Sequence, residues 1–319
     1  MSIKYQDMAM TGNTKPSRFV ASVSVILYFY FFIGSFIGSI PIVYVLFKNK
    51  DAIFDLTFST DVLAFMDKYV NPFANYIFTN FTIYLMLAGL IIATKFIHYR
   101  TFTSLITTKR KMQMSRFWVG FLVYGGLIAV GSVIDYFLSP ETYSFSFDAS
   151  KFWIALPFIL IMTPIQAATE EFVFRGYVIQ SFGLKIKNGM LLSVISGFMF
   201  TLPHLMNPEV TASSKEGIIS TLCMILNYFF IGMIFAMVTI KTNSLEAAIG
   251  AHAVNNLIGF LIVSYPDNVL ATNTVFYTST FNSAGSLISV IITGILFYFI
   301  TGFIIKEPVQ TVEEIKTTC

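Results

Sequence analysis

Long apolar runs recur along this chain, and they constrain its fold more than any other feature of the sequence. About 20 apolar residues in a helix span a hydrocarbon core of about 30 Å. Runs of this kind lie at 20–47, 75–97, 117–138, 152–182, 189–206, 218–240, 244–264 and 284–305. Only 12% of the 319 residues are charged, whereas a soluble domain has about a quarter. The sequence therefore predicts an all-α, polytopic membrane protein with about eight transmembrane helices.

The basic residues predict how the chain is oriented in the membrane. The loop at 98–116 contains five Lys or Arg residues and no acid, and the turn after the fourth run adds Lys185 and Lys187. Basic residues concentrate in cytoplasmic loops, and with eight spans both segments lie on the side of the N-terminus. We therefore expect a multi-pass protein with both termini in the cytoplasm. The first run is too long for a cleaved signal peptide, so we interpret it as a retained helix.

Composition argues against several other classes of protein. The formal net charge is only +3, and the basic residues form no single stripe, so no nucleic-acid partner is expected. The two cysteines, Cys223 and Cys319, form no CxxC pattern and predict neither a disulfide framework nor a cysteine metal site. The surrounding lipid is the one partner that composition alone predicts.

Ionisable residues inside the apolar runs are the candidates for function, because each costs at least about 3 kcal/mol in hydrocarbon on insertion scales. Glu170, Glu171 and Arg175 occur in the stretch "TEEFVFRG", directly after a run without charge. Glu171 and Arg175 are four residues apart and share a helical face. We predict an ion pair between them, which offsets the desolvation of both groups and leaves Glu170 free.

Two further pairs of residues have the same helical spacing. Phe200 precedes His204 by four residues, so its ring can pack beneath the imidazole and fix its orientation. His252 precedes Asn256 by four residues, so both point into one place. Counting helical rise from the turn after the fourth run places Glu170, His204 and His252 at similar depths. We expect them to converge in the middle third of the bilayer.

A carboxylate, two imidazoles and a carboxamide around one buried cavity suit hydrolysis. The carboxylate takes a proton from water as a general base, and a histidine beside it orients that water or protonates the leaving amine. The other histidine and the asparagine are donors suited to an oxyanion. As an alternative, Glu170, His204 and His252 bind zinc, since two His and one Glu form a known catalytic shell. The sequence lacks HExxH, so the familiar zincin geometry is absent.

These motifs resemble those of the CPBP family of intramembrane proteases. "EEFVFR" (170–175) fits EExxxR, "FTLPH" (200–204) fits FxxxH and "HAVNN" (252–256) fits HxxxN, in the family's order and each within a predicted span. The family contains the type II CAAX prenyl endopeptidases and the bacteriocin-processing or Abi-type proteins. The resemblance covers about a third of the chain, from 152 to 264.

The resemblance implies an intramembrane endopeptidase. Glu170 would activate water with His204, His252 and Asn256 would stabilise the oxyanion, and Glu171 and Arg175 would support the site. Family members are often called metalloproteases, and a metal-free glutamate mechanism has also been argued, so zinc stays an open alternative. The partner implied is a peptide or protein substrate, either prenylated and CAAX-type or of the bacteriocin type, and the expected location is a prokaryotic cell membrane.

Three segments follow from this interpretation. Residues 1–151 contain three helices with short loops, 152–264 form the catalytic core, and 265–319 contain an outer loop, the last helix and a polar tail. Two other functions stay open. A proton-coupled carrier would use the buried carboxylate and histidines as a relay, and an immunity or scaffold protein would keep the fold without catalysis. The carrier predicts inverted repeats, which the sequence does not show, and the scaffold predicts a missing motif residue, whereas all are present.

Overall fold

The computed structural model describes residues 4–58, 62–268, 270 and 272–306, most of which are helical. Within this part of the chain, six helices are long and apolar enough to cross a membrane. They are α1 (Pro16–Leu27) continued by η2 (Tyr28–Gly34), α2 (Ser35–Gly38) and α3 (Ile40–Lys48); α6 (Pro72–Ile92) with η3 (Ala93–Ile97); α7 (Met114–Leu138); α8 (Ala149–Glu171) with η6 (Phe172–Val178) and α9 (Ile179–Gly183); α12 (Ile218–Thr242); and α14 (Ser283–Ile304). The predicted all-α, polytopic membrane fold is confirmed.

The number of spans differs from the predicted eight, although a helix occupies each predicted run. α10 (Gly189–His204) and α13 (Glu246–Leu261) have only 16 residues each, or about 24 Å of rise. α10 is followed by α11 (Pro208–Glu216), and the chain bends by 85° between the two helices. If this bent pair crosses the membrane as one span, the number of candidate spans is seven. The spans were predicted from the length and apolarity of the runs. Neither property reveals that α10 ends at His204, directly after Pro203, or that Pro208 begins a separate helix.

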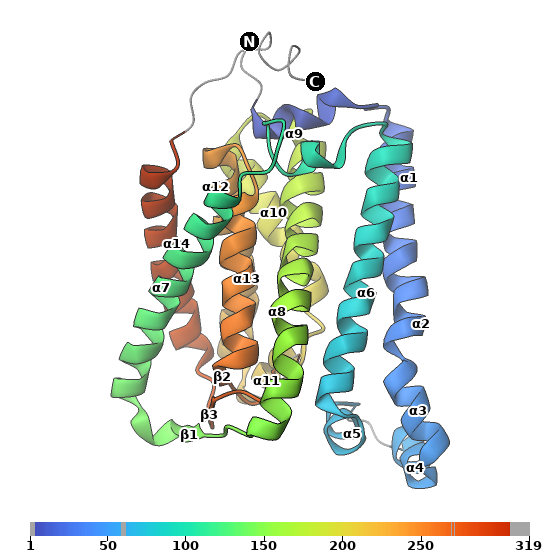
Figure 1. Ribbon diagram of the computed structural model, residues 1–319, viewed down its shortest axis with the longest axis vertical. Coiled ribbons are helices and arrows are strands. Elements are labelled where there is room, and N and C mark those ends of the chain that lie inside the picture. Colours follow the sequence, from blue (N-terminus) through green and yellow to red (C-terminus); the bar gives the residue numbers. More distant parts are fainter. Residues whose placement is uncertain (1–3, 59–61, 269, 271, 307–319) are drawn as a thin grey trace.

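Short elements close the two ends of the bundle (Figure 1). η1 (Tyr5–Thr11) lies at the end where α14 finishes, which we call the terminal face. The other end, the opposite face, contains α4, α5 and a three-stranded sheet in which β3 pairs with β1 antiparallel and with β2 parallel. The remaining bounds are α4 (Lys50–Phe58), α5 (Val62–Tyr69), η4 (Phe102–Leu105), η5 (Pro140–Thr142), β1 (Tyr143–Phe145), β2 (Val263–Ser264) and β3 (Phe276–Thr278).

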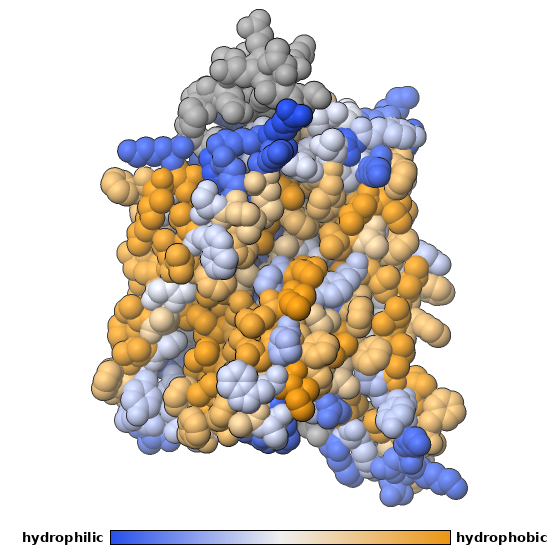
Figure 2. All heavy atoms as spheres, viewed as in Figure 1, coloured by the Kyte–Doolittle hydropathy of each residue, from blue (hydrophilic) through white to orange (hydrophobic). Residues whose placement is uncertain are grey.

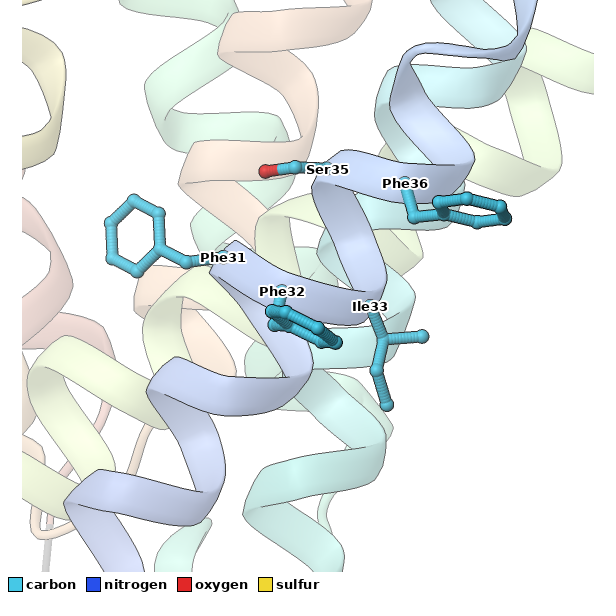
Figure 3. A pocket seen from close by; sticks show the side chains of 5 residues that line it. All are labelled: Phe31, Phe32, Ile33, Ser35 and Phe36. Carbon is cyan, nitrogen blue, oxygen red and sulfur yellow. The ribbon is translucent and has the colours of Figure 1, made fainter.

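The surface agrees with a membrane location. Figure 2 shows hydrophobic residues over the middle of the molecule and hydrophilic residues at its two ends. A hollow of about 500 Å³ in this band is lined by five residues of η2 and α2. Figure 3 shows their side chains, which are those of Phe31, Phe32, Ile33, Ser35 and Phe36. Because Phe32 and Phe36 are 69% and 77% exposed, this surface suits contact with lipid chains. The side of the membrane on which the terminal face lies stays a prediction.

α13 is the most enclosed helix around the site, because small residues let its neighbours approach closely. It packs against α7, α8 and α12. A Cβ added at Gly250 of α13 would lie 2.0 Å from the carbonyl oxygen of Phe117 in α7, and one added at Gly120 would lie 1.9 Å from that of Ala247. Small residues at a crossing are what brings two membrane helices into backbone contact.

We expect Gly250→Val to destabilise the protein by about 3 kcal/mol or more, because the added atoms overlap the backbone of α7 and overpacking alone costs about 1–3 kcal/mol. Thermal unfolding of the purified protein in detergent checks this. Gly126→Val is the matched control, since a Cβ at Gly126 of α7 meets nothing within 4 Å. Equal unfolding midpoints for the two variants would contradict the close crossing of α7 and α13.

Candidate functional site

The structure brings three of the sequence-predicted residues together around one carboxylate oxygen. Oε2 of Glu170, near the end of α8, lies 3.9 Å from Nε2 of His204 and 3.8 Å from Nε2 of His252. His204 is the last residue of α10, and His252 stands in the second turn of α13. The side chains of Glu170, His204 and His252 are 12%, 18% and 6% exposed. The three groups therefore meet at one largely buried site.

A change in helix geometry directly follows Glu170. The α-helix of α8 ends at Glu171, and η6 continues it as a π-helix from Phe172 to Val178. A π-helical turn is wider than an α-helical turn, and such turns are frequent at functional sites. The two adjacent glutamates can then serve different partners, with Glu170 directed to the histidines and Glu171 directed along the helix to Arg175.

The hydrogen bonds of the two histidines fix which nitrogen faces Glu170. His204 Nδ1 lies 2.6 Å from the carbonyl oxygen of Phe200, and His252 Nδ1 lies 2.7 Å from Oε1 of Glu171. A carbonyl oxygen and an ionised carboxylate can only accept, so each Nδ1 carries the proton and donates it. In the neutral rings, both Nε2 atoms are then acceptors that face Glu170.

Glu171 forms the predicted ion pair and a second contact that the sequence did not predict. Its Oε1 lies 3.1 Å from Arg175 Nη1, and both side chains are fully buried. The same oxygen accepts the proton of His252 Nδ1. The Arg175 guanidinium also lies 4.2 Å from the centre of the Phe200 ring, an arrangement that favours a cation. Glu171 therefore connects the buried arginine to the site through His252.

Two aromatic rings pack against His204. The ring centre of Phe200 lies 4.3 Å from that of His204, which is the packing that their spacing predicted. Tyr228 of α12 packs on His204 as well, with ring centres 4.6 Å apart, and its hydroxyl accepts a hydrogen bond from Asn207. Contacts from α10 and α12 thus restrict the imidazole that faces Glu170.

Asn256 lies one turn beyond His252 on α13 and is half-buried. Its Oδ1 accepts a hydrogen bond of 3.1 Å from Nδ2 of the neighbouring Asn255. Within the described part of the chain, no hydrogen bond joins Asn256 to Glu170, His204 or His252. Asn256 follows His252 by four residues and so shares its helical face, and its role stays a prediction.

Two side chains at the site were missed by the sequence analysis. Gln166 donates a hydrogen bond of 3.4 Å from Nε2 to Oε1 of Glu170, and Tyr228 stacks on His204. The sequence did contain an indication for Gln166, because this residue precedes Glu170 by four residues within an otherwise apolar run and so shares its helical face. Tyr228 had none, because its helix meets α10 only in the tertiary structure.

The separations between Glu170 and the two histidines are larger than those in a zinc centre. Two ligands of a tetrahedral zinc with bonds of about 2.0 Å lie roughly 3.3 Å apart, and both nitrogens are farther than this from Glu170 Oε2. Among the described residues, no group of three or more His, Cys, Asp or Glu is placed to hold a metal ion. The three side chains would have to move closer together to bind zinc, so we derive the mechanism below without a metal.

The fold and the site together define a class: a polytopic helical membrane protein with a glutamate and two histidines facing one another in its interior. Residues 151–258 match the family described as type II CAAX prenyl endopeptidase Rce1-like. The chain is also 33% identical over 216 residues to the uncharacterized protein YyaK of Bacillus subtilis (strain 168), an alignment that covers 67% of this chain and 69% of that protein. No solved structure matches the chain significantly.

The chain belongs to the Rce1-like family of type II CAAX prenyl endopeptidases. Membership supports an intramembrane endopeptidase activity in general, and together with the apolar helices it supports an integral membrane location.

We expect Arg175→Met to destabilise the protein by about 3–5 kcal/mol, because it leaves the fully buried Glu171 carboxylate without its cation. The measurement is the unfolding midpoint in detergent, together with the amount of protein in the membrane. Adding Glu171→Gln should recover part of the loss, since neither charge of the pair then remains.

The control is Lys151→Met, which removes a partner of the exposed 3.1 Å pair with Asp148 at the start of α8. Exposed pairs contribute little, so its unfolding midpoint should equal that of the parent. If Arg175→Met were as stable as this control, the buried ion pair would not be a stabilising contact.

Proposed function

We propose that the chain hydrolyses a peptide bond near the membrane with a water molecule activated by Glu170 and His204. The observation that carries this proposal is the position of the Nε2 atoms of His204 and His252, each within 4 Å of one Glu170 oxygen. A water between these groups donates one hydrogen to Glu170 and one to His204. Its lone pair is then free to attack a carbonyl carbon.

Glu170 carries the proton that moves during the reaction from the water to the leaving amine. Glu170 takes one proton from the water as the oxygen bonds to the carbonyl carbon, which leaves a tetrahedral oxyanion. Glu170 then transfers this proton to the amide nitrogen, the C–N bond breaks, and the products are a carboxylic acid and an amine. The same carboxyl group thus acts first as a general base and then as a general acid.

His252 and Asn256 are proposed to stabilise the oxyanion. In this role His252 is an imidazolium that donates from Nε2 to the oxyanion while Nδ1 donates to Glu171 on the far side of the ring. Arg175 in turn holds the Glu171 carboxylate in place. The Asn256 amide is a second donor. All four proposed catalytic residues lie within 152–264, which is therefore the proposed catalytic core.

We propose a peptide or protein as the substrate. The family's name joins CAAX with prenyl groups, and for this chain a prenylated C-terminal peptide and an unprenylated peptide of the bacteriocin type are the two candidates. Purified protein incubated with matched prenylated and unprenylated fluorogenic peptide libraries separates them. Cleavage of only one library identifies the class of substrate.

Glu170→Gln should lower the rate of peptide cleavage at least about 10³-fold, because the general base is lost while the shape of the side chain is kept. His204→Ala should cause a similar loss. Both variants should accumulate in the membrane and unfold cooperatively like the parent. Glu141→Gln, which changes an exposed carboxylate on the opposite face, is the control and should cleave like the parent. Undiminished cleavage by Glu170→Gln would reject the proposed base.

A zinc chelator should leave the cleavage rate unchanged, because the proposed water is held by Glu170 and His204 alone. The measurement is the initial rate before and after prolonged chelation, followed by zinc analysis of the protein. Loss of activity that added zinc restores, in the parent but not in His252→Ala, would replace this mechanism by the zinc alternative with Glu170, His204 and His252 as ligands.

A further inference from the structure

Gln166 lies one helical turn before Glu170 on α8 and belongs to none of the motifs described above. Only 7% of it is exposed. Its Nε2 donates to Oε1 of Glu170 at 3.4 Å, so it contacts the oxygen that does not face the histidines. Its own Oε1 is fully buried and accepts no hydrogen bond from the described residues.

The orientation of this carboxamide follows from its partner. An ionised carboxylate oxygen only accepts hydrogen bonds, so the NH₂ group of Gln166 must face Glu170 and the carbonyl oxygen must face away. An acceptor buried without a partner costs about 1–3 kcal/mol, and such groups are rare enough in proteins to require an explanation. A bound molecule that supplies a donor beside Glu170 would remove this cost.

A peptide substrate carries such donors in its backbone. An extended chain presents an N–H at every residue, and each N–H that enters a site without water needs an acceptor. The oxygen and the nitrogen of a carboxamide point in different directions, so Nε2 can keep its contact with Glu170 while Oε1 accepts from a donor on its other side. Main-chain hydrogen bonds of this kind bind extended peptides without reading their sequence.

We propose that Gln166 positions the substrate, with its Nε2 holding the general base Glu170 and its Oε1 accepting a backbone N–H of the bound peptide. This inference rests on the hydrolytic function proposed above. It assigns to one side chain the task of setting the distance between the base and the peptide. Loss of the acceptor should raise KM about tenfold, the effect of one hydrogen bond, and loss of the contact to Glu170 should lower kcat as well.

The test combines a variant with a change in the substrate backbone. The full chain in detergent is given an internally quenched peptide that the parent cleaves, and a series of analogues in which one amide outside the scissile bond is replaced by an ester. The ester removes a single N–H donor. In the parent, one ester position should raise KM about tenfold, and in Gln166→Met the same ester should have no further effect. Gln166→Leu provides a second apolar replacement in case the methionine variant does not fold.

Gln180→Met is the matched control. Gln180 is also a fully buried glutamine, but on α9, where it hydrogen-bonds Arg100 and the Ser104 carbonyl. This variant should keep the full effect of the ester. An ester effect of equal size in the parent and in both Gln166 variants, or no ester effect in the parent, would overturn the role of Gln166 while leaving the hydrolytic function intact. If the parent cleaved no peptide in any library, the proposed function and this inference would fail together.

Discussion

The buried contact between Glu171 and Arg175 is the interaction on which the site depends. Both side chains are fully buried within a membrane-spanning helix. An unpaired charge at such a position has a high free-energy cost. Each charge stabilises the other, and Glu171 uses the same oxygen to accept the Nδ1 proton of His252. The ion pair therefore fixes the ring orientation of His252 on α13. This orientation decides which of its two nitrogens faces Glu170.

Local helix geometry places the remaining groups. η6 widens the turn after Glu171, and α10 stops after 16 residues so that His204 stands at its end, inside the molecule. The chain then bends by 85° into α11. Backbone that departs from regular helix is tolerated at membrane depth only where it is buried in protein or lines a cavity, and here η6 directly follows Glu171 and the bend directly follows His204.

The proposed reaction gives the two glutamates different tasks. Glu170 takes up and returns a proton, whereas Glu171 holds Arg175 and His252. Their surroundings differ accordingly, because Glu171 has a guanidinium at 3.1 Å while Glu170 faces the Nε2 atoms of two histidines and the Gln166 amide. Carboxylates of one type acquire different roles when their neighbours differ in charge.

The sequence by itself determined the membrane class, the eight helical runs, the pairing of Glu171 with Arg175 and the packing of Phe200 on His204, because all of these depend on apolar length or on spacing within one helix. Only the tertiary structure decided that α10 and α13 are shorter than a full span, that His252 hydrogen-bonds Glu171, and that Tyr228 covers His204. These contacts join residues 24 to 81 positions apart, and helical periodicity contains no information about which faces of different helices meet.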